Sequence, residues 1–90
     1  MQSKNKKTMT AAERRHVSAV KKLSCVICGE PGPTEAHEPE QGAWYISVAL
    51  CPECHRGSGG WHGTRARWKN HKMDELGAIN ETLRRLMESA

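Results

Sequence analysis

The chain has few of the side chains from which a hydrophobic core is built. Its 90 residues include no phenylalanine, one tyrosine and three tryptophans, and the mean hydropathy is -0.73. A chain of this length buries only about 60% of the surface that its unfolded form exposes. A core so poor in aromatic side chains needs a disulfide or a metal to hold it together, and the four cysteines can supply one.

Long apolar runs are missing as well. No segment has the apolar part of a secretory leader, and none approaches the roughly 20 apolar residues that a membrane-spanning helix requires. Residues 1–7 are polar and basic. We therefore expect a cytoplasmic protein with no membrane partner. Thiols stay reduced in that compartment, so cysteine pairs there favour a metal site over disulfides.

Positive charge is absent from the middle of the chain. Residues 25–54 carry five acidic side chains and no lysine or arginine, whereas residues 1–24 carry seven basic side chains and residues 55–72 carry five. Two basic segments suit a polyanion such as nucleic acid. An ordinary solvated surface gives the same pattern, so charge alone leaves both interpretations open.

The cysteines form two pairs with the spacing of metal ligands, Cys25 with Cys28 and Cys51 with Cys54. Each C-x-x-C turn can direct two thiolates at one ion, and a site of four thiolates has no open position, which is typical of structural zinc. Four buried or redox-active cysteines are the alternative, and the repeated spacing disfavours it. The free energy of zinc binding is then part of the free energy of folding.

Sequence patterns predict a small α+β domain over residues 10–90, preceded by a disordered basic tail over residues 1–9. Thr10 and Glu13 form a capping-box pattern that predicts a helix over residues 11–23. Between the cysteine pairs we expect a short strand over residues 34–37 and a longer one over residues 43–50, the latter rich in aromatic and β-branched residues.

Two more helices are expected after the second cysteine pair. Thr64 would cap a short helix over residues 65–70. A last helix is expected over residues 73–88, with acidic residues in its first turn. Helical spacing predicts that the apolar side of this last helix consists of Leu76, Ile79, Leu83 and Leu86.

Three of the five histidines lie where a folded hairpin could bring them together. His37 falls in the first predicted strand, His55 directly follows the last cysteine, and His62 follows a glycine-rich stretch. Three imidazoles around one point favour a second metal, or a metal with a general base. We interpret the other two histidines, His16 and His71, as surface or capping residues.

The order of these motifs resembles the HNH endonucleases (His-Me finger, ββα-metal fold), in particular the small phage-type members and the phage recombination-enhancement nucleases. The likeness covers about residues 25–68. It is most specific in residues 48–56, Val-Ala-Leu-Cys-Pro-Glu-Cys-His-Arg, and the glycine-rich residues 57–63 add to it. The resemblance implies a zinc-stabilised ββα-metal core with N-terminal and C-terminal helices.

The resemblance further implies a divalent-metal-dependent endonuclease or nicking enzyme that hydrolyses DNA phosphodiester bonds, with a role in phage DNA recombination or processing inside a bacterial cell. His37 would be the general base, because neutral imidazole suits proton abstraction near neutral pH. His55 would bind the catalytic ion (Mg2+, Mn2+ or a second Zn2+), and His62 would be a further ligand or a phosphate contact. The DNA backbone would be held by Arg56, Arg65, Arg67 and Lys69. DNA is the expected ligand. The expected protein partners are a second copy of the chain, in a homodimer, or phage or host recombination proteins.

The chain departs from the family at two positions. Ala36 stands where the family has an Asp ligand before the base, and Ile46 stands where it has an Asn. If His37 were instead the ligand, Glu38 would stand at the base position. Because Glu38 points to the opposite face of the strand from His37, we keep His37 as the base. The alternative to a nuclease is a non-catalytic zinc-stabilised module that binds nucleic acid or a protein. A third possible function is that of a phage protein that acts on RNA.

Overall fold

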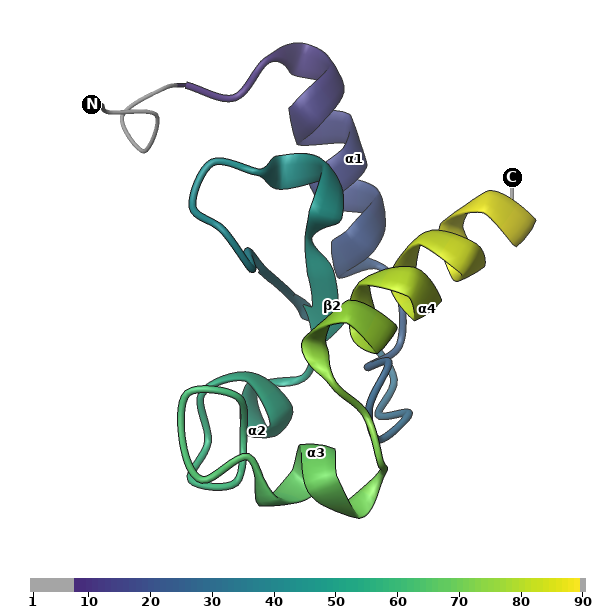
Figure 1. Cartoon of the computed structure of the whole chain (residues 1–90). Coiled ribbons are helices and arrows are strands. Elements are labelled where there is room, and N and C mark those ends of the chain that lie inside the picture. The colour runs from purple at the N-terminus through teal and green to yellow at the C-terminus, as the bar shows by residue number, and fades with distance from the viewer. Residues whose placement is uncertain (1–7, 90) are drawn as a thin grey trace.

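The computed structural model describes residues 8–89, in which four helices and a two-stranded sheet form a small α+β domain. Figure 1 shows α2 and α3 at one end of the molecule and α1 at the other, with β2 between them. No helix within residues 8–89 is long and apolar enough to cross a membrane. Of the predicted tail, residues 1–7 lie outside the described part. The elements are α1 (Ala11–Lys21), β1 (Glu35–His37), the 3-10 turn η2 (Trp44–Ile46), β2 (Val48–Leu50), α2 (Pro52–His55), α3 (Ala66–Asn70) and α4 (Glu75–Glu88).

Helix α1 begins where its capping pattern predicts. The hydroxyl of Thr10 accepts a hydrogen bond from the backbone N–H of Glu13 at 3.1 Å, and the Glu13 carboxylate accepts one from the backbone N–H of Thr10 at 2.8 Å. The helix ends two residues earlier than predicted. Val17 and Val20 are buried on its inner side, so α1 contributes two aliphatic side chains to the core.

The sheet is an antiparallel pair in which Glu35 lies opposite Leu50 and His37 lies opposite Val48. The predicted strand over residues 43–50 is wrong in its first half, because Trp44–Ile46 form the 3-10 turn η2. Strand β1 has only three residues, so it offers no backbone partner to residues 44–46. Those residues satisfy their hydrogen bonds locally instead, as when the Ser47 hydroxyl donates to the Trp44 carbonyl at 2.6 Å.

Helix α3 begins one residue later than predicted. Its N-cap is Arg65, which adopts a left-handed backbone conformation (φ 65°) and makes no side-chain cap. Thr64 was expected to be the cap, and its hydroxyl accepts only from the backbone N–H of Ala66, at 3.3 Å. Trp68 is buried in this helix and anchors it to the core.

Helix α4 packs on β2 through small residues and not through the predicted leucine stripe. Ala78 and Thr82 are fully buried, whereas Leu76 is 75% exposed. The predicted apolar side is therefore wrong at Leu76, although Ile79 and Leu86 are partly buried against the core. Small side chains allow the helix to approach the strand closely enough for the Thr82 hydroxyl to accept from the Ala49 backbone N–H at 3.4 Å.

Candidate metal centres

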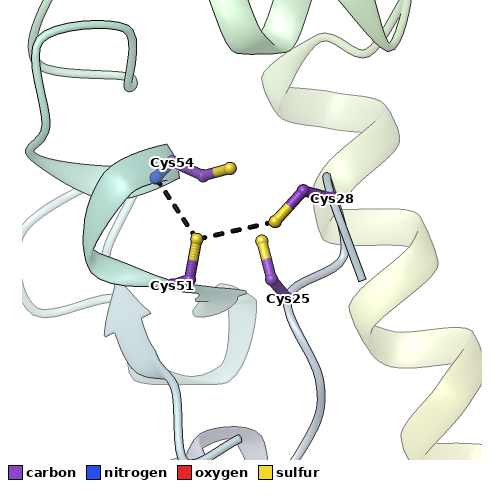
Figure 2. A group of neighbouring side chains, drawn as sticks. All are labelled: Cys25, Cys28, Cys51 and Cys54. Carbon is purple, nitrogen blue, oxygen red and sulfur yellow. Dashed lines mark hydrogen bonds between the residues drawn. The ribbon is translucent and has the colours of Figure 1, made fainter. Parts of the chain in front are cut away.

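Four thiols from two separate turns meet at one point (Figure 2). Cys25 and Cys28 precede β1, and Cys51 and Cys54 lie at the start of α2. The four sulfur atoms lie within 4.8 Å of one another, and none of them is in a disulfide. The 3.6 Å between Cys28 Sγ and Cys51 Sγ is close to the ~3.8 Å that a tetrahedral zinc with bonds of about 2.3 Å would set. The cluster is therefore positioned to bind a metal ion such as zinc.

The surroundings of the thiols fit a bound cation. Burial raises the pKa of Cys51 and of Cys54, because a thiolate loses its hydration there. A zinc ion reverses this effect by stabilising the thiolates directly. Four thiolates around Zn2+ leave negative charge uncompensated, and the Arg67 guanidinium, whose Nε donates to Cys54 Sγ at 3.2 Å, supplies positive charge at that point.

The chain after α2 folds back onto the backbone of the last thiol. The carbonyl oxygen of Cys54 accepts from the backbone N–H of Trp61 at 2.9 Å and from the indole Nε1–H of Trp68 at 2.8 Å. The two tryptophan rings contact each other, with centroids 4.6 Å apart. Trp68 is thus a core residue, and the loop that carries Trp61 is attached directly to the thiol cluster.

A glycine allows this loop to approach α2. A Cβ atom at Gly60 would lie 2.5 Å from the carbonyl oxygen of Glu53 and 2.8 Å from the carbonyl carbon of Cys54, closer than real Cβ atoms come. With glycine at that position, the backbone N–H of His62 donates to the carbonyl of His55 at 3.0 Å. The loop therefore places His62 next to the histidine that follows the last thiol.

Three imidazoles form a second cluster. One ligand nitrogen each from His37, His55 and His62 lies within 4.8 Å of the others, and the ring centroids are 5.0 to 5.4 Å apart. A tetrahedral ion with metal–nitrogen bonds of about 2.0–2.1 Å separates its ligands by ~3.4 Å, so the rings need to approach by at most about 1.4 Å. His37 is buried and His62 is exposed, which makes the cluster accessible from the His62 side.

Two carboxylates hold two of these rings. Nε2 of His37 lies 2.8 Å from Oε2 of Glu75, and Nδ1 of His55 lies 2.8 Å from Oε1 of Glu35. A carboxylate only accepts, so these ring nitrogens carry the protons. The lone pairs are then on Nδ1 of His37 and Nε2 of His55. Carboxylates orient metal-binding histidines in proteins in this way.

The ionisation of these groups suits metal binding at neutral pH. Hydrogen bonds from Arg56, with a smaller contribution from His55, lower the pKa of Glu35 to about 2. Burial lowers the pKa of His37, although the hydrogen bond to Glu75 opposes this effect. Near pH 7, Glu35 is therefore an anion and His37 is neutral, with a lone pair available for a proton or a metal.

The cations that were predicted to hold DNA differ in their surroundings. Arg56 donates to the Glu35 carboxylate through Nε at 3.0 Å and Nη2 at 2.5 Å, and Arg67 is bonded to Cys54. Arg65 has its guanidinium carbon 3.5 Å from the centroid of the Trp61 ring, and Lys69 is exposed. Arg56 and Arg67 thus have hydrogen-bond partners within the fold. Their assignment as DNA contacts stays a prediction.

Sequence reasoning grouped His37, His55 and His62, and the structure brings their rings together. It missed Glu75, which lies 38 residues from its partner His37, and no local pattern could have revealed that contact. The contact of Glu35 with His55 was only weakly indicated by the sequence, through the position of Glu35 on the same strand face as His37. Of the remaining histidines, His16 contacts Tyr45 with ring centroids 5.2 Å apart, and His71 is exposed.

Known protein families do not identify the chain. No family model matches it, and comparisons with curated proteins and with solved structures give no match either.

Proposed function

We propose that this chain is a divalent-metal-dependent endonuclease or nicking enzyme that hydrolyses phosphodiester bonds in DNA, with a zinc ion on the four thiols as its scaffold. The observation that supports the proposal most is the convergence of His37, His55 and His62 beside the thiol cluster. A purely structural zinc domain does not need three imidazoles at one accessible point, whereas in metal-assisted hydrolysis such groups can hold the catalytic ion and take up a proton.

The groups of this chain have separate roles in the proposal. His55 and His62 would hold a divalent cation, which stabilises negative charge on the scissile phosphate. His37 would take the proton of the attacking water, because it is buried and neutral near pH 7 and keeps a lone pair on Nδ1. Glu75 fixes the orientation of the His37 ring, and Glu35 fixes that of the His55 ring.

Ligand chemistry favours one of the three cations considered for this cluster. Imidazole nitrogen suits Zn2+ and other transition metals, whereas Mg2+ prefers oxygen ligands. Ala36 stands where the resembled family has a carboxylate ligand, so position 36 supplies no oxygen donor to the imidazole cluster. Mn2+ resembles Mg2+ in its preference for oxygen ligands. We therefore expect Zn2+ to support hydrolysis better than Mg2+ or Mn2+.

A non-catalytic module that binds nucleic acid or a protein is the second candidate. Ala36 and Ile46 offer no metal ligand, and Arg56 and Arg67 are bonded within the fold. This function predicts DNA binding that weakens steeply with salt and no cleavage with any metal.

The two candidates are distinguished by nicking of supercoiled plasmid in the presence of Mg2+, Mn2+ or Zn2+. We expect the wild-type protein to nick the plasmid, and His37→Ala and His62→Ala to lose the activity. His71→Ala is the matched control, because His71 is an exposed histidine outside the cluster. Circular dichroism and the zinc content of each variant check that the fold survives. Equal nicking by His37→Ala and wild type would show that the base is assigned wrongly. If the wild-type protein nicks the plasmid with none of the three ions, the nuclease proposal fails and the non-catalytic binding module is the remaining candidate.

A further inference from the structure

Arg65 is placed differently from the other cations near the imidazole cluster. Its Nε donates to the backbone carbonyl of Trp61 at 2.8 Å, and its guanidinium carbon lies 3.5 Å from the centroid of the Trp61 ring. The side chain is exposed, and no ion pair of Arg65 is found within the described residues 8–89. The guanidinium is therefore held in one position, and its terminal nitrogens have no carboxylate partner there.

The backbone at Arg65 supports a specific role. Its left-handed conformation (φ 65°, ψ 19°) is one that residues other than glycine adopt at a cost. Two hydrogen bonds hold it, from the Arg65 N–H to the Gly60 carbonyl at 3.0 Å and from the Lys69 N–H to the Arg65 carbonyl at 3.0 Å. Strained residues that the surrounding structure holds in place cluster at binding sites and active sites.

The Arg65 guanidinium lies near the imidazole cluster, because the ring that it contacts is next to His37. The Trp61 ring, on which it lies, has its centroid 6.2 Å from that of His37, and Trp61 directly precedes His62 in the chain. One strand of DNA carries a phosphate about every 3.4 Å along the helix axis. The guanidinium carbon is therefore within about 10 Å of the His37 ring, so a strand with one phosphate at the cluster would carry another within reach of Arg65.

We propose that Arg65, held on the Trp61 ring, binds a DNA phosphate next to the imidazole cluster, whereas Arg56 and Arg67 serve the fold by pairing with Glu35 and Cys54. The inference rests on the proposed function and singles out Arg65, among the four predicted DNA contacts, as the one whose guanidinium is held on an aromatic ring with its terminal nitrogens available. A planar guanidinium offers parallel donors that match two phosphate oxygens. Its Nε is already used for Trp61, so the terminal nitrogens would make this contact.

The test compares Arg65→Gln with Arg84→Gln, which removes the same charge. Arg84 is an exposed arginine on α4 already paired with Glu81 and Glu88. Binding of a fluorescent duplex oligonucleotide is measured by anisotropy over a range of salt concentrations without added divalent metal. We expect Arg65→Gln to weaken binding about tenfold, as for a lost hydrogen bond to a charged group, and to reduce the slope of log Kd against log salt by about one. Arg84→Gln should change both the affinity for DNA and the salt slope by less.

Further measurements separate phosphate binding from a merely structural role. Arg65→Lys keeps the charge but not the planar fork, so it should restore the salt slope and recover affinity only in part. Zinc content and melting temperature should be equal in all variants. If Arg65→Gln instead lowers the melting temperature and leaves the salt slope unchanged, the residue only supports Trp61 and the inference is overturned.

The same set of proteins distinguishes failure of this inference from failure of the proposed function. Plasmid nicking by the wild type together with equal DNA binding by Arg65→Gln and Arg84→Gln overturns the phosphate site and keeps the nuclease. Loss of binding in Arg65→Gln without nicking by any protein keeps the phosphate site in a binding module. No DNA binding by the wild type overturns both.

Discussion

The backbone N–H of His62 donates to the carbonyl oxygen of His55 at 3.0 Å, which joins the exposed His62 to the partly buried His55 through their main chains. His55 in turn follows Cys54, the last thiol, without an intervening residue. The imidazole cluster is therefore built on the turn that the thiols hold. A metal on the thiols would order α2, and α2 would order the loop that carries His62.

Loss of one thiol should abolish the fold. Structural zinc contributes apparent binding free energies of about 10–16 kcal/mol, which is comparable with the whole stability of a small domain. We expect Cys51→Ser to lose zinc and the helical circular dichroism signal. Ser58→Ala, in the exposed loop after α2, should keep both. A folded Cys51→Ser protein without zinc would contradict the structural role of the cluster.

A methyl group at Gly60 should separate the two clusters. In Gly60→Ala the new Cβ meets the Glu53 carbonyl at 2.5 Å, so the loop has to move away from α2 and take His62 with it. Overpacking of this kind typically costs about 1–3 kcal/mol, which a zinc-bound domain can tolerate. We expect the variant to keep one tightly bound zinc and to bind a second zinc at least about tenfold more weakly in calorimetric titration.

Gly59→Ala is the control for this loop. Its Cβ would lie 3.1 Å from Cγ of the flexible Arg67 side chain, which needs to shift only slightly, and 3.8 Å from the Arg67 backbone nitrogen, which is an ordinary contact. The second zinc should bind to Gly59→Ala as it does to the wild type. If Gly60→Ala also binds the second zinc normally, the position of His62 does not depend on the contact between the loop and α2.

Removal of the charge on Glu35 should weaken the imidazole site without unfolding the protein. The carboxylate orients His55 through the 2.8 Å contact with Nδ1, and the loss of such a partner usually reduces metal affinity about 10–100-fold. We expect Glu35→Gln to bind zinc at the imidazoles correspondingly more weakly in a competition titration with a chelating dye. Glu81→Gln, a change of the same kind on α4, should have no effect on it.

How far the sequence could predict this site depends on the separation of the residues involved. The C-x-x-C spacing is local and predicted the thiol cluster, and the hairpin implied by the two strands predicted that His37 and His55 approach each other. The contact between Glu75 and His37 could not be predicted, because it depends on how α4 crosses the sheet. That crossing is set by the burial of Ala78 and Thr82, while helical spacing alone pointed to Leu76, which the structure exposes.

The stability of the protein should depend on pH through His37. Its pKa is lowered from 6.5 mainly by burial, so the folded state binds fewer protons at this ring than the unfolded state does. The stabilisation from the neutral ring is complete above pH 6.5 and declines as the pH falls from there towards the folded pKa. An NMR titration of the His37 ring in the zinc-bound protein should give a midpoint below 6.5.

The partner of His37 provides a check on the sign of this shift. The hydrogen bond to Glu75 raises the pKa of His37 against the effect of burial. In Glu75→Gln the midpoint should therefore move further down, whereas Glu81→Gln should leave it unchanged. A midpoint above 6.5 in the wild type would mean that the ring is not buried as the structure has it.

The structure leads us to expect two metal sites in one small domain, with the thiol site supporting the imidazole site. Elemental analysis of the zinc-saturated protein after gel filtration tests it most directly. We predict two zinc ions per chain for the wild type, one for His62→Ala and two for His71→Ala. A single zinc in the wild type and in both variants would contradict the account, because the three imidazoles would then bind no metal.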